Sequence, residues 1–269
     1  MVRATLVLGL TLAVASTAFA QRTGGFGRSN DDWCAGAGHD GDRVSYCEVR
    51  ETTIGAAGQI AVDAGKNGGI SVRGWDRGDA VVRARVVGYG ATRADAQRIA
   101  SQVRVETAGI VKADGPAADN RDEGWYVAYE VSVPRNAMLA LTANNGGLVI
   151  ENFAGTATFH TKNGGIVLRQ VGGDLHGETT NGGVTVDLAG DRWNGAGLDV
   201  TTRNGGIAIR LPQPYSAELE VGTTHGRLNI GVPITVQGTI GRSLTTVLGA
   251  GGARIRAMTT NGGVSVRPL

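Results

Sequence analysis

The sequence has little proline and few aromatic residues, and its charges nearly cancel. Proline supplies 6 of 269 residues and aromatic residues make up 5%. The 26 basic side chains almost balance the 24 acidic ones, so the chain lacks the basic footprint of nucleic-acid binding. After the first twenty residues no apolar run is long enough to span a bilayer. We therefore expect no nucleic-acid partner and no membrane-spanning helix.

The N-terminus has the form of an export signal. Arg3 precedes an apolar run from Ala4 to Val14, and small residues end the segment at Ala20. We expect a signal peptide over residues 1–20, whose removal leaves a periplasmic or secreted protein.

Cysteine is nearly absent, and its two copies lie close together in the chain. Cys34 and Cys47 stand 13 positions apart, in a stretch of mostly glycine and polar residues. An exported chain folds in an oxidising compartment, where a disulfide is favoured over two free thiols. We expect the bond Cys34–Cys47 to staple a leader over residues 21–50, which has little apolar material of its own.

Glycine, by contrast, is abundant, with 44 residues, and it recurs in a motif of the form T-x-N-G-G. The copies TTNGGVTV at 179–186 and TTNGGVSV at 259–266 are nearly identical. Recurrence of this kind is typical of stacked-repeat proteins. The asparagine column of the repeat comprises Asn67, Asn145, Asn163, Asn181, Asn204 and Asn261, with His225 in a degenerate copy.

Residues at fixed distances from the asparagine keep one chemical character. The residues three and five places after it are apolar in every copy, as Val184 and Val186 are, whereas the residue between them varies. Upstream, apolar residues such as Leu175 and threonines such as Thr179 continue the alternation. This period of two indicates two short strands joined by a Gly-Gly bend. Because such a unit buries its inner face only when copies stack, we predict an all-β β-solenoid, similar to a parallel β-helix, with right-handed winding.

We assign the asparagines a structural role. Asparagine tolerates the left-handed backbone region and hydrogen-bonds its own turn, and asparagines stacked at an inward corner would satisfy one another's amides. The alternative, a glycine loop that binds a ligand, requires a following helix or a Lys-Ser/Thr pair. Here a strand follows each copy.

One further column of the repeat is charged. The residues six places after the asparagine alternate in sign, in the order Glu151, Arg169, Asp187 and Arg210. An exposed cross-strand ladder of ion pairs explains the column. As an alternative, Arg169 and Arg210 are candidate ligand-binding residues in a binding stripe.

Trp75 and Trp193 are two further candidates for ligand binding. Both lie in polar, turn-like stretches, where an exposed indole could stack on a sugar ring. Alternatively, they cover seams of a thin core, with the indole N–H bonded to a neighbour.

The first half of the chain does not repeat cleanly. We predict one solenoid domain over residues 51–269, with an irregular part over 51–138 and regular repeats with a C-terminal cap over 139–269; a separate small β domain is the alternative for the first part. The segment 92–103 predicts one short helix, because Thr92 and Asp95 resemble a capping box and its apolar residues form one stripe. Segments around Gln237 and Gly251 are interpreted as broken copies of the repeat.

Several segments resemble a known family. CEVRE at 47–51, NGGISVRGWDR at 67–77, VSVPR at 131–135 and the serial T-x-NGG-[IVL]-x-[VIL] repeat are similar to the bacterial putative adhesin family of β-strand-repeat proteins, a domain of unknown function. The resemblance covers Val44 to the C-terminus. It implies a β-solenoid fold and an envelope or surface location, and it brings no catalytic or binding residue to this sequence.

The sequence contains no spacing typical of a catalytic or metal site. Its histidines and cysteines form neither H-x-x-x-H nor C-x-x-C, so we expect no metal and no cofactor. We expect a non-catalytic protein that binds an envelope glycan or protein through an extended solenoid face. A purely structural envelope role is one alternative. The other is an extracellular polysaccharide lyase or hydrolase, for which the available carboxylates are Asp174, Glu178, Asp187 and Asp199.

Overall fold

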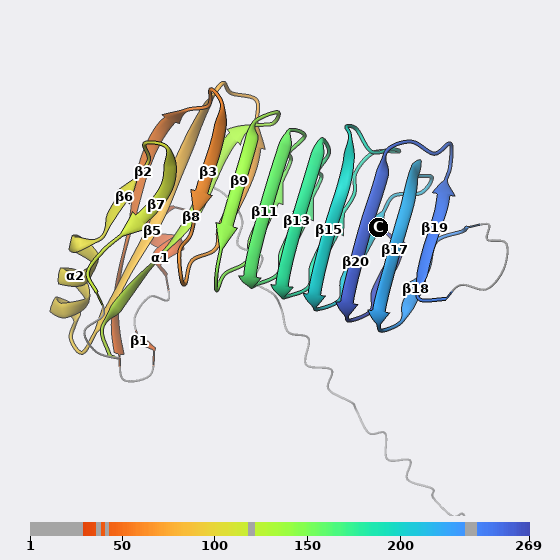
Figure 1. Cartoon of the computed structure of the whole chain (residues 1–269). Helices are drawn as coiled ribbons and strands as arrows, with labels where there is room; N and C mark the ends of the chain where they lie inside the picture. Colours follow the sequence, from red (N-terminus) through yellow and green to blue (C-terminus); the bar gives the residue numbers. More distant parts are fainter. Residues whose placement is uncertain (1–28, 36–38, 41–42, 118–121, 235–240) are drawn as a thin grey trace, which may run out of the picture.

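The computed structural model describes residues 29–35, 39–40, 43–117, 122–234 and 241–269. The predicted signal peptide over residues 1–20 lies outside the described residues. The described chain forms two β-sheets that face each other, with strands side by side along one axis (Figure 1). Neither of its helices has the length and apolar character that crossing a membrane requires.

The two sheets contain eleven and ten strands of the described chain. In spatial order, sheet A consists of β1 His39–Asp40, β2 Arg43–Gly55, β5 Asp79–Gly90, β8 Gly124–Pro134, β4 Ile70–Trp75, β10 Leu148–Glu151, β12 Ile166–Arg169, β14 Val184–Asp187, β16 Ile207–Leu211, β21 Val264–Pro268 and β18 Leu228–Ile230. Sheet B consists of β19 Ser243–Leu248, β17 Ala217–His225, β20 Arg254–Asn261, β15 Gly197–Asn204, β13 Asp174–Asn181, β11 Thr156–Asn163, β9 Met138–Ala143, β3 Gln59–Asp63, β7 Ile110–Asp114 and β6 Arg104–Glu106. The helices are α1 Asn30–Cys34 and α2 Arg93–Gln102.

Each regular repeat supplies one strand to each sheet, and we call this pair of strands a rung. Neighbouring rungs pair in parallel and in register, so that Thr161 lies opposite Thr179 and Asn163 opposite Asn181. Equivalent residues of different repeats are therefore neighbours along the stack. The predicted all-β, solenoid-like architecture is confirmed; the right-handed winding stays a prediction.

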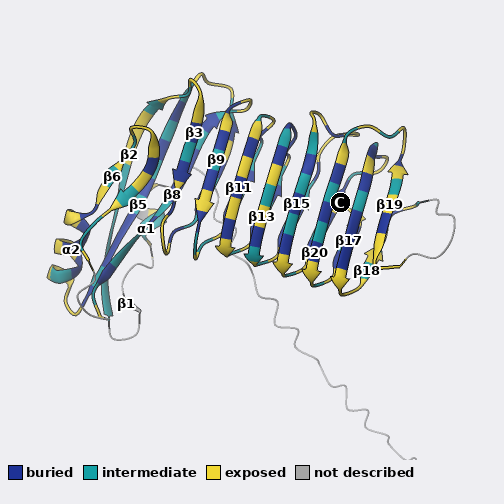
Figure 2. Ribbon diagram, in the orientation of Figure 1, coloured by how far each residue is buried: buried dark blue, intermediate teal, exposed yellow. Residues whose placement is uncertain are grey.

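The core lies between the sheets and is shared by all rungs. Along the strands of the regular rungs, such as β11 and β12, buried residues alternate with more exposed ones (Figure 2). The buried column of sheet B comprises Leu139, Ala157, Leu175, Leu198, Ile255 and Leu219. Full burial of a leucine or valine side chain is worth about 1.5–3 kcal/mol. Because every inner face contacts the next rung, the stack obtains the core that a single repeat cannot form.

The spatial order of rungs differs from their order in the chain at the C-terminal end. The last rung, β20 and β21, lies between the β15–β16 rung and the β17–β18 rung. The chain reaches this place through β19, which pairs antiparallel with the outer side of β17. The interpretation of the segment around Gly251 as a broken copy is therefore wrong, because it forms the turn after β19. Gln237 lies outside the described residues.

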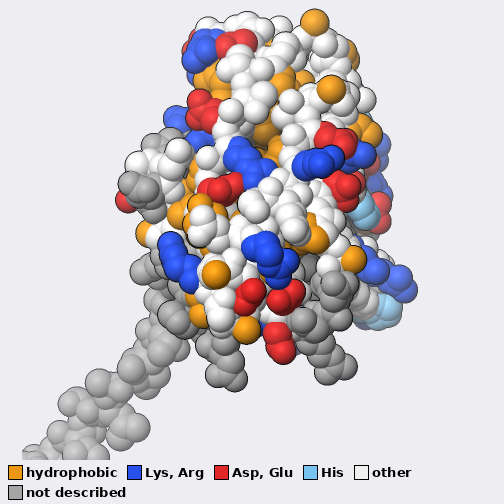
Figure 3. All heavy atoms as spheres, turned by 90° about the vertical axis from the view of Figure 1, so that its left-hand side faces the viewer, with side chains coloured by type: hydrophobic (Ala, Val, Ile, Leu, Met, Phe, Trp, Pro, Cys, Tyr) orange, Lys and Arg blue, Asp and Glu red, His pale blue; other side chains and the backbone are white. Residues whose placement is uncertain are grey.

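The N-terminal end has the same kind of excursion. After β4 the chain forms β5, α2, β6, β7 and β8 before β9 and β10 return to pair with β3 and β4. Helix α2 confirms the predicted short helix, and the Thr92 side chain accepts a hydrogen bond from the Asp95 N–H at its start. Figure 3 views this end and shows acidic, basic and hydrophobic side chains mixed over its surface. The core of this half is continuous with that of the regular rungs.

The leader is held to sheet A by the predicted disulfide. Cys34 and Cys47 are bonded, with 5.6 Å between their Cα atoms, and the bond joins α1 to β2. The sequence did not predict helix α1, whose Ser29 side chain accepts from the Asp32 N–H at 3.1 Å. Structural disulfides persist in oxidising compartments, so this bond indicates an extracytoplasmic protein.

Candidate functional site

The asparagines form one continuous hydrogen-bonded ladder along the stack. Each amide Nδ2 donates to the Oδ1 of the preceding rung, at 2.7 Å from Asn163 to Asn145 and at 2.8 Å from Asn181 to Asn163. The remaining ladder bonds join Asn145 to Asn67, Asn204 to Asn181 and Asn261 to Asn204. All six side chains are exposed. The expected inward position is therefore wrong, because the alternation along the strand is interrupted just before the asparagine: the register pairs Thr161 with Thr179 and Asn163 with Asn181 but omits the pair between them.

Close approach of neighbouring rungs explains the first glycine of each motif. A Cβ on Gly182 would lie 2.0 Å from the carbonyl oxygen of Gly164, and a Cβ on Gly205 would lie 2.0 Å from that of Gly182. Left-handed backbone geometry does not explain the motif, since the non-glycine residues with positive φ in the described chain are Asn152 and Gln170, outside the ladder. The expectation of left-handed asparagines is wrong as well.

Threonine fills the inward corner that we expected asparagine to occupy. Thr179 is fully buried and donates from Oγ1 to the carbonyl oxygen of Gly164 at 2.8 Å. The same bond recurs from Thr161, Thr202, Thr259 and Thr223 to the first glycine of the preceding rung. A buried carbonyl without a donor is costly, and each threonine removes that cost.

The degenerate copy of the motif occupies the outer end of the ladder. His225 pairs with Asn261 and has no further rung beyond it among the described residues. Gly226 is retained, because its Cβ would lie 1.9 Å from the Gly262 carbonyl oxygen. Arg227 replaces the second glycine of the motif. In the other rungs this glycine lies close to the backbone of the next rung, as Gly206 does to Gly263. The sequence His225-Gly226-Arg227 thus belongs to a rung that contacts another rung, β20–β21, on one side only among the described residues.

The charged column forms the predicted ladder on sheet A. Arg169 lies 2.6 Å from Glu151 and 3.8 Å from Asp187, and Arg210 donates two hydrogen bonds of 2.6 Å to Asp187. Exposed pairs of this kind contribute about 0–1 kcal/mol each. The guanidinium groups of Arg169 and Arg210 are thus engaged within the ladder, and a role in ligand binding stays a prediction.

The two candidate tryptophans differ in exposure. Trp193 is only 5% exposed, and its Nε1 donates to the Gly173 carbonyl at 3.0 Å. The alternative of an exposed indole that stacks on a sugar ring is therefore wrong at this position, whereas the interpretation of Trp193 as a cover of the core with a bonded indole N–H agrees with the structure. Trp75 is half-buried, bonds the Asp79 carbonyl at 2.9 Å and has the Arg77 guanidinium 4.2 Å from its ring centre.

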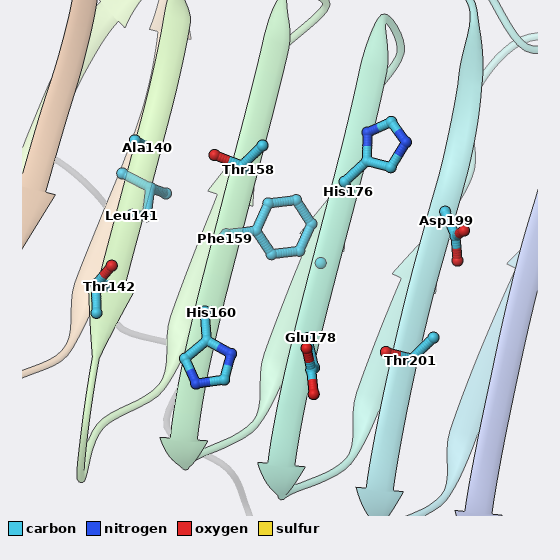
Figure 4. A pocket seen from close by; sticks show the side chains of 11 residues that line it. Ala140, Leu141, Thr142, Thr158, Phe159, His160, His176, Glu178, Asp199 and Thr201 are labelled. Carbon is cyan, nitrogen blue, oxygen red and sulfur yellow. The ribbon is translucent and has the colours of Figure 1, made fainter.

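A groove of about 380 Å³ crosses the outer face of sheet B over β9, β11, β13 and β15 (Figure 4). Two rows of outward side chains on successive strands form its walls. One row consists of Thr158, His176 and Asp199, and the other of Thr142, His160, Glu178 and Thr201. The groove is thus lined by hydroxyl, imidazole and carboxylate groups.

The floor of the groove is formed by residues of inward parity. Leu141, Phe159 and Gly177 line it between the two rows. Gly177 carries no side chain, and a Cβ there would lie 1.9 Å from Cε2 of Phe159. The phenyl ring therefore occupies the space under β13 and leaves the floor shallow and smooth.

Internal contacts orient the acidic groups at the groove. The Asp199 carboxylate accepts a hydrogen bond from Arg256 at 2.8 Å, and Asp174 lies 3.4 Å from Nδ1 of His176. Within the described part of the chain, no three His, Cys, Asp or Glu side chains converge on a possible metal position. The sequence did not predict this groove. The polar residues three and five places before the asparagine, such as His160 and Thr158, were the available signal.

Comparison with known proteins identifies the fold family. Residues 96–267 match the sequence profile of Toastrack DUF4097 domains. The chain belongs to the Toastrack DUF4097 family. No curated protein matches this Toastrack chain.

Among solved structures, the Toastrack chain is similar to a putative cell adhesion protein from Clostridium sporogenes ATCC 15579, with 9% identity, a TM-score of 0.47, and coverage of 83% of this chain and 100% of that one. It is also similar to a putative adhesin from Bacteroides fragilis NCTC 9343, with 11% identity, a TM-score of 0.36, and coverage of 83% and 97%. Likenesses this distant do not indicate what the Toastrack chain binds.

Proposed function

We propose that this Toastrack protein is an exported, non-catalytic adhesin-type module that binds an extended envelope glycan along the outer face of sheet B. The groove across β9, β11, β13 and β15 carries the proposal. Neighbouring strands are about 4.8 Å apart, so its walls offer polar groups at regular steps. A polymer lying along the stack would make several modest contacts at once, and such contacts reinforce one another.

The polarity of the groove favours a glycan over a protein. Cores of protein interfaces are rich in aromatic and apolar side chains. The large exposed hydrophobic residues of the described chain lie outside the groove; they are Ile110, Met138, Val247 and Leu269. Hydroxyl, imidazole and carboxylate groups instead complement the hydroxyl groups of a sugar.

The same groove bears on the enzyme alternative, because Glu178 and Asp199 line it. Glycoside hydrolysis requires two carboxyl groups at a defined separation across the scissile bond, and active sites commonly exclude water. Here Asp199 is bonded to Arg256 and Glu178 is exposed on an open face. These features support binding without cleavage.

A matched pair of variants tests the proposal. A glycan array probed with the purified protein selects a ligand, and its affinity is then measured for Thr158→Arg, which places a large side chain on a groove wall. Thr185→Arg is the control, because Thr185 is an outward threonine on β14 in the other sheet. We expect Thr158→Arg to weaken binding about tenfold or more and Thr185→Arg to leave it unchanged.

Three outcomes would overturn the proposal. These are no glycan binding on the array, equal affinity of wild type and Thr158→Arg, and cleavage of the bound glycan that Glu178→Gln abolishes. The third would establish the enzyme alternative.

A further inference from the structure

A second pocket lies at the N-terminal end of the stack, away from the groove. It has a volume of about 280 Å³. Its lining comes in part from the first Asn-Gly-Gly corner, the end of β7 and the start of β8. Strand β8 first pairs with β4 where Tyr129 meets Ile70. Trp125 and Val127 come before that point in β8, where the edge facing β4 has no paired strand. The pocket lies at this unpaired part of the edge.

Three aromatic residues line the pocket. Tyr89, Trp125 and Tyr126 are all half-buried. Because successive residues of a strand point to opposite faces, Trp125 and Tyr126 lie on opposite sides of β8. Trp125 is fixed by a 2.9 Å hydrogen bond from Nε1 to the Pro116 carbonyl. At about 280 Å³ the pocket is slightly smaller than the roughly 300–1,000 Å³ of most small-molecule sites, so its size suits a ligand of one small ring.

Two side chains of the pocket lining, Asn67 and Lys66, are hydrogen-bond donors. Asn67 is the first member of the asparagine ladder: its Oδ1 accepts from Asn145 at 3.0 Å, while its Nδ2 has no partner within the described chain. Each amide of the ladder points its Nδ2 toward this end, and hydrogen bonds in a chain polarise one another. The ladder therefore ends here on a strengthened donor.

Positive charge accompanies these donors. Lys66 is exposed, lines the pocket and forms no ion pair in the described chain. The guanidinium of Arg43 lies 4.9 Å from the ring centre of Tyr89. No carboxylate is among the described lining residues. The chemistry thus favours a ligand that has an apolar ring face and a negatively charged acceptor.

We propose that this pocket binds one acidic sugar residue, with the ring against Trp125 and the carboxylate at Lys66 and Asn67. This site is independent of the groove on sheet B, whose lining contains no lysine or arginine. It would let the protein recognise the end or a branch of an anionic glycan.

NMR titration of the ¹⁵N-labelled full protein with D-glucuronate tests the proposal. We expect the indole N–H signal of Trp125, assigned with Trp125→Phe, to shift on addition of glucuronate. Glucose lacks the carboxylate and acetate lacks the ring, so we expect the affinity of each to be at least about tenfold lower than that of glucuronate.

Two variants with matched controls locate the site. Lys66→Gln removes the charge, and Lys162→Gln makes the same change beside Asn163 in a regular rung. Asn67→Asp keeps an oxygen for Asn145 to donate to but replaces the free donor with a negative charge. We expect Lys66→Gln and Asn67→Asp to weaken glucuronate binding about tenfold, while Lys162→Gln and the groove variant Thr158→Arg leave it unchanged.

Equal binding of glucose and glucuronate, an unshifted Trp125 signal, or full affinity of Lys66→Gln would each overturn the proposal. The proposed function is tested separately, because Thr158→Arg affects only the groove.

Discussion

Asn261 donates a 2.8 Å hydrogen bond to Asn204, although 57 residues separate them in the chain. The bond exists because the C-terminal rung lies directly against the β15–β16 rung, inside the earlier β17–β18 rung. All six asparagines of the motif are thereby contiguous, and His225 is displaced to the end. The ladder is continuous in space even though the motif is interrupted in the sequence.

Removing an internal member of the ladder should cost more than removing the first. Asn181 both donates to Asn163 and accepts from Asn204, whereas Asn67 only accepts from Asn145. Because a net hydrogen bond is worth about 0.5–1.5 kcal/mol and these are exposed, we expect Asn181→Ala to lower the free energy of unfolding by about 1 kcal/mol. Denaturant titration should show about half that loss for Asn67→Ala. Equal losses would contradict a role for the ladder bonds.

The two glycines of one motif should differ in their tolerance of alanine. A Cβ at position 205 would lie 2.0 Å from the backbone oxygen of Gly182, whereas a Cβ at position 206 would lie 3.3 Å from that of Gly263. The first contact forces the rungs apart, so we expect Gly205→Ala to lose about 3 kcal/mol or more. Gly206→Ala should lose about 1 kcal/mol. Thermal unfolding of both variants measures the difference, and the reverse order would refute this account of the motif.

The buried threonine hydroxyl should contribute to stability through its bond to the neighbouring rung. Thr179→Val keeps the shape of the side chain but leaves the Gly164 carbonyl without its donor. We expect a loss of about 1–3 kcal/mol. Thr180→Val, at the more exposed neighbouring position, is the control and should change stability by less than about 0.5 kcal/mol. If both variants unfold alike in denaturant, the hydroxyl bond does not stabilise the stack.

Tyr129 should make the protein sensitive to high pH. Burial, with a smaller effect of the Asp63 charge, raises the pKa of Tyr129 above its usual value, and its hydroxyl has no hydrogen-bond partner in the described chain. Because the pKa of Tyr129 is higher in the folded than in the unfolded protein, the fold favours the neutral phenol. The full stability is therefore present below the unfolded pKa of about 10, and stability is lost as the pH rises above it. Burial likewise raises the pKa of Tyr215 to about 12.

The variant Tyr129→Phe tests this assignment. It removes an unpaired buried hydroxyl, so we expect stability at neutral pH to be unchanged or higher by about 1 kcal/mol. Above about pH 10 its free energy of unfolding should fall less steeply than that of the wild type. Denaturant titrations across the alkaline range measure both, and parallel pH curves would exclude Tyr129 as the titrating group. Tyr215→Phe serves as the comparison.

The sequence predicted the strands well because their periodicity follows from strand geometry. Leu175 and Val184 recur at fixed distances from Asn181, and both are buried in the core. The same alternation predicted the wrong face for the asparagine. Thr179 is inward, and Asn181, two residues later, would also be inward if the alternation continued. The alternation is interrupted between them, at Thr180, which has no partner in the register with β11, and the sequence pattern did not predict this interruption.

The order of rungs and both proposed binding sites could not be predicted in this way. Motif spacing indicates how many rungs exist, but not that Asn261 lies next to Asn204. The groove walls, such as His160 and Glu178, have the polarity of any solvated face until the register places them in adjacent rows. The pocket depends on residues as distant as Lys66 and Trp125, which only the N-terminal excursion brings together.

The placement of residues 254–268 between β15 and β17 has a consequence for biosynthesis. These strands leave the ribosome after β15 to β18, yet they lie between them in the folded stack. A prematurely terminated polypeptide would leave β15 and β17 with unpaired edges, and such edges promote aggregation and proteolysis. Synthesis through β20 and β21 is thereby a condition for closing the stack.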